Sequence, residues 1–458
     1  MSTAGTAPYG AWKSPITADL IVGGSVGLGQ VALDGEDIYW TESRPSEDGR
    51  TIVVKRAAGG AISDITPAGF SVRGKVHEYG GGSFAVAGGT VWFCNETDQR
   101  VWAQSPGAAP RPLSETGARR YADFSVDSGR SRLLAVCEDH SGAGEAENFL
   151  IAVEFAGGTT ALHRGRDFYA FPRLSPDGGK LAWICWDHPN MPWDGAELWL
   201  ADIAADGGLV NEKCVAGGPD EAIFQPQWSP GGVLHFVSDR TGWWNLYRLA
   251  GEPEPLCAME AEFGLPVWQF GLSTYGFTGD GEIVAAHAVG GVWRLGLLAR
   301  DGGALRPLDL PFADVAGIRA GGGHAAFTAA GSGDASAIVL LDTKSGAYEI
   351  VRRSAGFDID PRFVSQPEPV SFPTTDGFAH GFLYGPANAD FSAPKGSLPP
   401  LIVKGHGGPT GQTTGAYNLK IQYWTSRGFA VLDVNYRGST GFGRDYRRKL
   451  DGAWGIAD

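Results

Sequence analysis

The feature that most constrains the fold is a pattern that recurs along most of the chain. Each copy has a strand-like run, a turn rich in Gly, Asp and Pro, a second apolar run and a strand with aromatic residues. The clearest copies occupy residues 172–202 and 227–248. Weaker copies begin near Val31, Ser83, Asp123, Ser273 and Val315. Seven copies spaced by roughly 40 to 55 residues are typical of propeller blades, so the sequence predicts a seven-bladed β-propeller over residues 31–365.

The turn chemistry of the two clearest copies supports this interpretation. Pro176 is followed by Asp177 and two glycines, and Pro230 is also followed by two glycines. Proline presets φ for such a turn, and glycine supplies the positive φ that it needs. One four-stranded sheet cannot bury both faces, whereas sheets stacked around an axis bury each other. A row of unrelated sandwich domains is the alternative, but it would not share one turn signature at one place in each repeat.

The composition is typical of a mainly β fold, and the net charge argues against some classes of binding partner. The 458 residues include 69 Gly and 15 Trp, and the net charge is -14. That charge argues against a nucleic-acid or anionic-membrane partner. No run of 18 apolar residues occurs and residues 1–9 lack the pattern of a signal peptide, so we expect neither export nor a membrane span.

Cysteine and histidine usage predicts neither a metal nor a cofactor. The five cysteines are scattered, and no histidine pair has the i, i+4 spacing of metal ligands. We expect small, buried cysteines in a protein of the reducing cytoplasm. The oligomeric state stays open.

A second domain is expected over residues 366–458, while residues 1–30 form an N-terminal segment. Residues 368–373 and 378–384 flank a Thr-Thr-Asp-Gly turn, which predicts a hairpin. Residues 401–404 suggest a buried strand, and residues 429–434 suggest another. Between them, Tyr417, Ile421 and Trp424 follow helical spacing, and Gly428 suits a helix C-terminus. Strand, helix and strand describe the beginning of a parallel α/β sheet.

The loop after the first of these strands carries the chemistry. It reads His406-Gly407-Gly408-Pro409 and precedes the predicted helix. In α/β-hydrolases a His-Gly-Gly loop in this place presents backbone N–H groups to a developing oxyanion. A plain glycine-rich turn is the alternative for so short a motif.

Several longer motifs together resemble the prolyl oligopeptidase family of serine peptidases, and within it the acylaminoacyl-peptidase and dipeptidyl-aminopeptidase branch. They are the His406 loop with Thr410, residues 422–443, Gly452-Ala453-Trp454-Gly455, residues 76–82 and residues 186–194. The resemblance spans nearly the whole chain. It implies a propeller placed over an α/β-hydrolase domain, and cleavage of short peptides by a Ser, Asp and His triad.

The sequence departs from that family in one decisive respect. A hydrolase nucleophile sits in a Gly-x-Ser-x-Gly elbow and is followed by Asp and then His, but no such elbow follows Gly408. The part after Gln366 is also shorter than the roughly 200 to 250 residues of a complete domain. We therefore expect a C-terminally truncated chain without its triad. Ser25 satisfies the elbow pattern by letter, but an apolar run toward the first blade follows it instead of a helix.

The resemblance also implies roles for individual residues. Gly408 is expected to offer an oxyanion-hole N–H, and His406 to orient the loop. Glu78 and Tyr79 could meet the amino terminus of a peptide, since a carboxylate pairs with an ammonium, or could simply belong to a turn. Three further substrate contacts are considered: Trp186 and Trp193, in a loop unusually aromatic for a connector, and Arg437, for which an ion pair is the alternative.

Two functions from different classes follow from these observations. The first is a serine-type peptidase of the prolyl oligopeptidase family that cleaves short peptides, represented by a chain that is inactive alone. The second is a catalytically inactive propeller that binds partners, with the hydrolase part as a scaffold. The sequence alone leaves dipeptidyl-aminopeptidase, acylaminoacyl-peptidase and endopeptidase specificity open.

Overall fold

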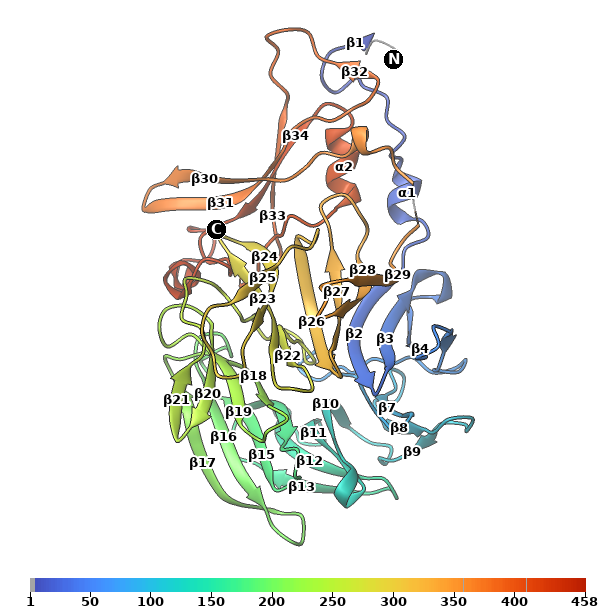
Figure 1. The fold of residues 1–458 in the computed structure, drawn as a ribbon, viewed down its shortest axis with the longest axis vertical. Helices are drawn as coiled ribbons and strands as arrows, with labels where there is room; N and C mark the ends of the chain where they lie inside the picture. Colours follow the sequence, from blue (N-terminus) through green and yellow to red (C-terminus); the bar gives the residue numbers. More distant parts are fainter. Residues whose placement is uncertain (1–4, 357, 409) are drawn as a thin grey trace.

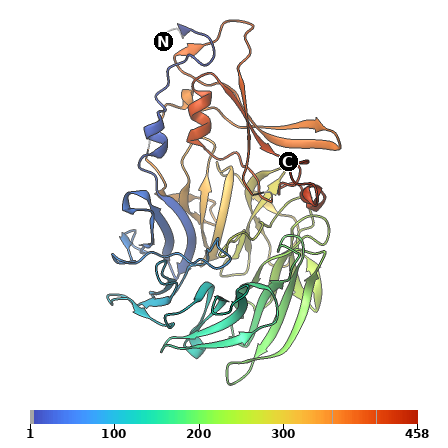
Figure 2. The same ribbon diagram turned by 180° about the vertical axis from the view of Figure 1, so that it is seen from behind.

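Seven four-stranded antiparallel sheets form a ring in the computed structural model, which describes residues 5–356, 358–408 and 410–458 (Figure 1). Each sheet takes its four strands from consecutive positions in the chain. The predicted seven-bladed propeller is confirmed. The C-terminal α/β region lies over one face of the ring, and the N-terminus lies beside it (Figures 1 and 2).

The first four blades run through residues 27–218. Their strands are β2 (Gly27–Asp34), β3 (Asp37–Arg44), β4 (Arg50–Arg56) and β5 (Ile62–Asp64); β6 (Phe84–Ala87), β7 (Thr90–Cys94), β8 (Val101–Gln104) and β9 (Arg111–Pro112); β10 (Arg119–Asp127), β11 (Arg132–Asp139), β12 (Glu147–Glu154) and β13 (Thr159–His163); and β14 (Phe168–Leu174), β15 (Lys180–Trp186), β16 (Ala196–Ile203) and β17 (Leu209–Gly218). Short 3-10 turns lie at η1 (Pro45–Glu47) and η2 (Ser128–Arg130).

The last three blades run through residues 223–353. Their strands are β18 (Ile223–Trp228), β19 (Leu234–Ser238), β20 (Asn245–Ala250) and β21 (Glu252–Pro255); β22 (Tyr275–Phe277), β23 (Ile283–Val289), β24 (Val292–Leu298) and β25 (Arg306–Leu308); and β26 (Asp314–Gly321), β27 (His324–Ala330), β28 (Ala337–Asp342) and β29 (Tyr348–Arg353).

The predicted turn residues join the first two strands of their blades. Gly178 and Gly232 adopt φ of 70° and 78°. Asp177 accepts hydrogen bonds from the Ser175 hydroxyl at 2.6 Å and the Gly179 N–H at 2.9 Å, which holds the β14–β15 turn. Because these contacts join residues close in the chain, the blades can be recognised from the sequence.

The ring closes between the first and seventh blades without exchange of a strand. Trp40, Ile52 and Val54 of the first blade share one buried cluster with Ala326 and Ile338 of the seventh. The Glu42 carboxylate, which is 1% exposed, accepts from the Arg352 Nε at 2.8 Å across the same seam. Apolar packing and an ion pair with a buried carboxylate therefore close the propeller.

The C-terminal region contains one four-stranded sheet in the order β30–β31–β34–β33. The strands are β30 (Glu368–Thr374), β31 (Gly377–Tyr384), β33 (Leu401–Gly405) and β34 (Ala430–Asn435). The helices are α2 (Leu419–Thr425) and α3 (Arg444–Arg447), with 3-10 turns η3 (Pro361–Phe363) and η4 (Arg448–Leu450). The hairpin and the parallel β33–β34 pair are both as predicted.

The prediction that residues 401–404 form a buried strand is wrong. β33 lies at the edge of the sheet, where Leu401 is 54% and Val403 is 63% exposed. An apolar run indicates where a strand forms, but its burial depends on a covering element that the local sequence does not specify. Gly428, by contrast, has the φ of 93° expected after the helix.

The N-terminal segment packs against the C-terminal region. β1 (Gly5–Thr6) pairs in parallel with β32 (Phe391–Ser392), and α1 (Ala18–Val22) leads into the first blade. The Gly10 N–H donates to the Arg427 carbonyl at 3.0 Å, and a side chain at Gly428 would crowd this segment. The chain thus starts on the C-terminal region, runs around the whole ring and returns.

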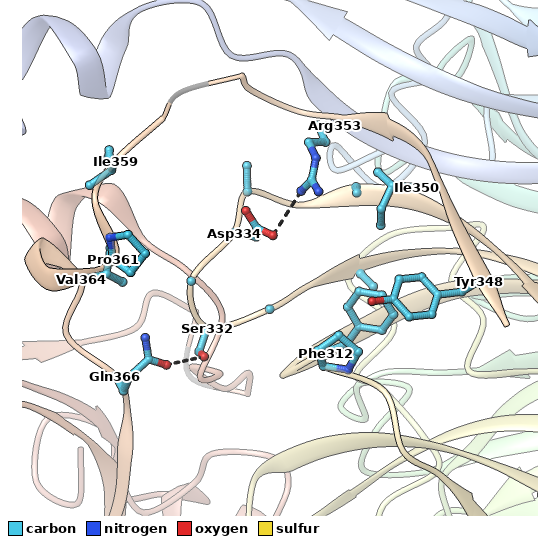
Figure 3. Close-up of a pocket in the computed structure, with 16 residues that line it drawn as sticks. Phe312, Ser332, Asp334, Tyr348, Ile350, Arg353, Ile359, Pro361, Val364 and Gln366 are labelled. Atoms are coloured by element: carbon cyan, nitrogen blue, oxygen red, sulfur yellow. Dashed lines mark hydrogen bonds and ion pairs between the residues drawn. The ribbon is translucent and has the colours of Figure 1, made fainter. Parts of the chain in front are cut away.

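The linker between the two regions borders a cavity of about 440 Å³ beside the seventh blade (Figure 3). Asp334 pairs with Arg353 at 3.3 Å on one side, and the Ser332 hydroxyl donates to Gln366 at 2.6 Å on the other. The two contacts attach both ends of the linker to the blade.

No helix in the part of the chain that the structure describes is long and apolar enough to cross a membrane.

The five cysteines form no disulfide in the described structure, and four of them are buried. Cys214 is exposed on the outermost strand of its blade, so the expectation that all five are buried is wrong at this position. An outer strand leaves one face to solvent, and the apolar residues around Cys214 do not reveal which face it occupies.

Candidate functional site at the domain interface

The glycine loop begins where β33 ends, at the edge of the sheet. His406 stacks on Tyr436 with ring centroids 4.3 Å apart, and its Nε2 lies 2.8 Å from the Ser439 hydroxyl. The Tyr436 hydroxyl also donates to the carbonyls of His406 and Gly408, both at 3.2 Å. Burial lowers the pKa of His406, which favours its neutral form. These contacts fix the conformation of the glycine loop through its His406 side chain and its carbonyl groups.

Gly408 adopts φ of 66°, a left-handed conformation that favours glycine. Neither Gly407 nor Gly408 donates its backbone N–H to another residue within the described structure. The loop carbonyls are held by Tyr436 while these N–H groups are left for another acceptor. Pro409, the last residue of the predicted motif, lies outside the described residues.

Trp268 links this loop to the propeller. It lies in the segment between the fifth and sixth blades, and its indole Nε1 donates to the Thr410 carbonyl at 2.6 Å. A methyl group built on Gly408 would lie 3.9 Å from the Trp268 ring. Tyr79 and Trp193 approach the same indole, with ring centroids 5.4 Å and 4.4 Å away. Three of the predicted site residues therefore meet around a residue that the sequence did not single out.

Glu78 and Tyr79 lie in a strained, exposed loop. His77 and Glu78 adopt φ of 53° and 63°, and the three following glycines also have positive φ. Tyr79 is 58% exposed. Arg120 donates to Glu78 at 2.7 Å and lowers the pKa of that carboxyl, so Glu78 is an anion with a cation already beside it.

The structure does not bring Trp186 and Arg437 into this group. Trp186 is 5% exposed, stacks on Phe168 of its own blade with centroids 5.4 Å apart, and lies edge-on to His77 with centroids 5.9 Å apart, away from Trp268. Arg437 pairs with Asp376 and donates to the Ala457 carbonyl at 3.1 Å. Arg437 thus has the ion pair that was the alternative to a substrate contact.

A buried ionic cluster fixes the C-terminal region over the fifth blade. Asp239, with a fully buried side chain, accepts from Arg444 and Arg447, each at 2.5 Å. Nearby, the Glu262 carboxylate accepts the N–H groups of Trp244 and Gly443, both at 2.9 Å. Burial raises the pKa of Glu262. The cluster ties α3 to the propeller and so sets the distance between the glycine loop and Trp268.

Sequence reasoning missed Trp268, Asp239 and Glu262. Trp268 is 142 positions from Thr410, and the two arginines are more than 200 positions from Asp239. The one signal for Trp268 was its place among Phe263 and Phe270 in a long segment between blades. Among the described residues, no group of three His, Cys, Asp or Glu side chains could hold a metal ion.

Comparison with known proteins finds a family model, a solved structure and curated relatives that this chain resembles. Residues 416–458 match the model of the prolyl oligopeptidase family. A solved structure of puromycin hydrolase superimposes with a TM-score of 0.93 and 37% identity, and the match covers 99% of this chain and 72% of that one.

Two curated relatives match over short C-terminal stretches. Dipeptidyl aminopeptidase BIII of Pseudoxanthomonas mexicana is 46% identical over 55 residues, which are 12% of this chain and 8% of that protein. The acylamino-acid-releasing enzyme of Mus musculus is 45% identical over 67 residues, or 15% of this chain and 9% of that enzyme. The chain thus aligns with less than a tenth of either curated relative.

Proposed function

Because this chain belongs to the prolyl oligopeptidase family, we propose that it supplies the propeller and the oxyanion side of a serine peptidase active site. The observation that carries the proposal is the contact of Trp268 with the glycine loop, with Tyr79 and Trp193 on the same indole. The N–H groups of Gly407 and Gly408, which donate to no other described residue, then lie beside aromatic surfaces that can hold a peptide. Gly408 is the proposed donor.

We propose an aminopeptidase-type specificity for short peptides and aminoacyl amides. One matching solved structure is that of a puromycin hydrolase, and puromycin has a free α-amino group next to its amide bond. Glu78 is an exposed anion on the propeller side and can pair with such an ammonium if Arg120 yields its place. An N-acylated substrate has no charge there, so the acylaminoacyl type fits this carboxylate less well.

We also propose that the 458-residue chain is inactive by itself. No Gly-x-Ser-x-Gly elbow follows the glycine loop in this sequence, and loss of a triad serine costs on the order of 10⁶ in kcat. The purified chain should neither hydrolyse aminoacyl chromogenic substrates nor react with a fluorophosphonate probe. Stoichiometric labelling that Ser25→Ala abolishes would contradict the proposal.

Substrate recognition is tested by binding rather than turnover. Trp193 and Trp268 provide a fluorescence signal at the site, so puromycin and N-acetylpuromycin can be titrated into the chain. We expect puromycin to bind more tightly, and Glu78→Gln to remove about tenfold of that preference. Glu254→Gln is the matched control, because Glu254 also pairs with an arginine, at 2.9 Å, on an exposed strand of another blade. Equal binding of both compounds would exclude Glu78 as the ammonium site.

The alternative function is a binding scaffold without catalysis. The exposed apolar edge at β33 favours it, because an unpaired strand edge can accept a strand from a partner. The coding sequence downstream of codon 458 distinguishes the two functions. An in-frame Gly-x-Ser-x-Gly supports the peptidase, whereas a stop codon with a stable product supports the scaffold.

We propose that the protein works in a reducing compartment such as the cytoplasm, because four of its cysteines are packed as small, buried side chains with free thiols.

A further inference from the structure

A second polar cavity lies inside the propeller, on its central axis. It has a volume of about 370 Å³ and is lined by the innermost strands of six blades and by the segment before β22. Gln30, Asp123, Arg173, Gln227 and Arg319 contribute polar groups to its wall. None of these residues belongs to the interface site. Gly271 also lines the cavity, three positions after Trp268.

Five innermost strands carry the same irregularity at this cavity. In each, two residues of the inner strand oppose one residue of its neighbour. The five irregularities lie between Leu28 and Val31, Ala122 and Ser125, Ala170 and Arg173, Phe224 and Gln227, and Ala316 and Arg319. In every case the residue just after the bulge lines the cavity. β-Bulges re-aim side chains and are common next to functional sites.

Three of these bulges are also strained. Asp123, Phe171 and Gln225 adopt φ of 59°, 54° and 47°, a region that costs non-glycine residues about 1–3 kcal/mol each. The strain is offset in part by hydrogen bonds between blades, such as the Phe171 N–H to Asp123 at 2.6 Å. The same distortion in successive blades places polar side chains at one level of the channel.

The charges at this level do not cancel. Asp123 accepts from Arg173 at 2.6 Å, so those two residues neutralise each other. Arg319 donates only to backbone carbonyls, to Ile318 at 2.9 Å and to Gly271 at 3.1 Å, and forms no ion pair with any carboxylate among the described residues. Burial and the nearby Arg173 lower the pKa of Arg319 to about 10, which leaves it charged at neutral pH. The cavity therefore has one uncompensated positive charge.

A structural role does not explain that charge. Elsewhere in the channel, neutral amide side chains make the same kind of hydrogen bond to a backbone carbonyl. Gln30 donates to the Phe84 carbonyl at 2.7 Å, and Gln225 donates to the Tyr275 carbonyl at 2.8 Å. A glutamine at 319 could hold Gly271 in the same way without the cost of a partly buried cation that has no ion-pair partner among the described residues. The positive charge of Arg319 is therefore not needed for its hydrogen bond to the Gly271 carbonyl.

We propose that the propeller channel contains a carboxylate-binding site centred on Arg319. The planar guanidinium presents N–H groups that match a carboxylate, Gln227 adds a neutral polar group, and one negative charge balances the wall. The ligand is a small free carboxylate or the carboxyl terminus of a short peptide. The site involves no catalytic residue, so it stands or falls apart from the proposed peptidase function.

Calorimetric titration of the 458-residue chain tests the site. The probes are acetate, Gly-Gly-Gly and Gly-Gly-Gly amide, at pH 7 and constant ionic strength. We expect saturable one-to-one binding of a carboxylate, about tenfold weaker binding of the amide, and at least about tenfold loss in Arg319→Gln. Arg306→Gln is the control, because Arg306 is 59% exposed on an outer strand and lies outside the channel.

The outcomes separate the two sources of the carboxylate. Binding of acetate and the tripeptide alike identifies a small free carboxylate, whereas binding of the tripeptide alone identifies a peptide terminus. Arg319→Lys keeps the charge and should bind more tightly than Arg319→Gln, and circular dichroism shows whether each variant is folded. No saturable binding, equal binding of the amide, or unchanged affinity in folded Arg319→Gln would overturn the proposal.

Discussion

The propeller and the C-terminal region differ in how their sheets are covered. Each blade is covered by its neighbours, and the largest buried cluster runs continuously through several blades. In the described structure, the sheet of the C-terminal region and α2 share a small buried cluster of Phe382, Tyr384, Ile421 and Val431, and β33 leaves an exposed apolar edge. Closure makes the ring independent of other elements, while an open sheet depends on whatever covers it.

The same comparison explains how the two regions are joined. The C-terminal region is held by the N-terminal segment, by the linker after the seventh blade and by the Asp239 cluster. Val292 of the sixth blade also packs against the small buried cluster of the C-terminal sheet, so the position of the glycine loop over Trp268 depends on these polar contacts together with a small apolar one. A perturbation of those contacts should affect the site before it affects the ring.

The largest expected effect is a difference in protection from protease. Limited digestion with trypsin should cut first at Lys395, in the exposed connector before β33, while residues 27–353 persist as a fragment. Cleavage after Lys13 should follow, because its backbone carbonyl is held by Asn388 of the C-terminal region and is released when that region unfolds. Mass spectrometry of the time course identifies the fragments. Equal protection of both regions in a monodisperse monomer would favour the scaffold function over the peptidase.

Removing the charge of Asp239, the buried anion that pairs with Arg444 and Arg447, should detach the C-terminal region. In Asp239→Asn, Arg444 and Arg447 lose the charge that compensates them, and breaking such a buried pair costs about 3–5 kcal/mol. Hydrogen exchange should rise over α3 and the glycine loop while the blades stay protected. Asp220→Asn is the control, since Asp220 is 84% exposed and pairs with Arg448 at 3.2 Å. It should cost less than about 1 kcal/mol. Uniform loss of protection would mean that the Asp239 cluster also stabilises the ring.

The seam of the ring is the corresponding weak point of the propeller. Glu42 accepts from Trp40, Arg44 and Arg352 while almost fully buried, so Glu42→Gln should lower the free energy of unfolding by about 2–3 kcal/mol. Denaturant titration measures the loss. Glu349→Gln removes another ion pair across the seam, to Arg56, but Glu349 is 55% exposed and should contribute less than about 1 kcal/mol. Equal losses would show that burial is not what makes the Glu42 contact strong.

What could be predicted from the sequence follows the range of the contacts involved. The blades, the hairpin after the linker and the Gly428 helix end depend on residues close in the chain, such as Asp177 with Gly179. The glycine loop was recognisable for the same reason. Its partners were not, because Trp268 and Thr410 are brought together only by the docking of two regions.

The errors at β33 and Cys214 have a common cause, which also explains why the pairing of the N-terminal segment was not predicted. A strand pattern indicates local conformation, whereas burial depends on which distant element covers the strand. Leu401 and Val403 look like core residues and are exposed, while the segment before the first blade pairs with β32, at the other end of the chain. The bulges that line the channel were equally invisible, since they depend on register between strands rather than on composition.

Acid should produce the smallest of the expected effects, and it should act on the propeller. Burial lowers the pKa of His235 and His287 to about 4 each. Because the folded state binds fewer protons than the unfolded state, this stability is present above about pH 6.5 and is lost as the pH falls toward about 4. At about pH 5.5 each histidine should cost about 1.4 kcal/mol.

His287→Phe separates this effect from general acid denaturation. His287 stacks on Phe263 with centroids 5.5 Å apart, so a phenyl ring keeps the contact and removes the titrating group. Unfolding free energies measured between about pH 7.5 and 5 should then fall less steeply than in the parent chain. His324→Phe, the same substitution at an exposed position of the seventh blade, is the matched control. An unchanged slope in His287→Phe would place the acid sensitivity outside the buried histidine, and the docking cluster around Glu262 would become the region to examine.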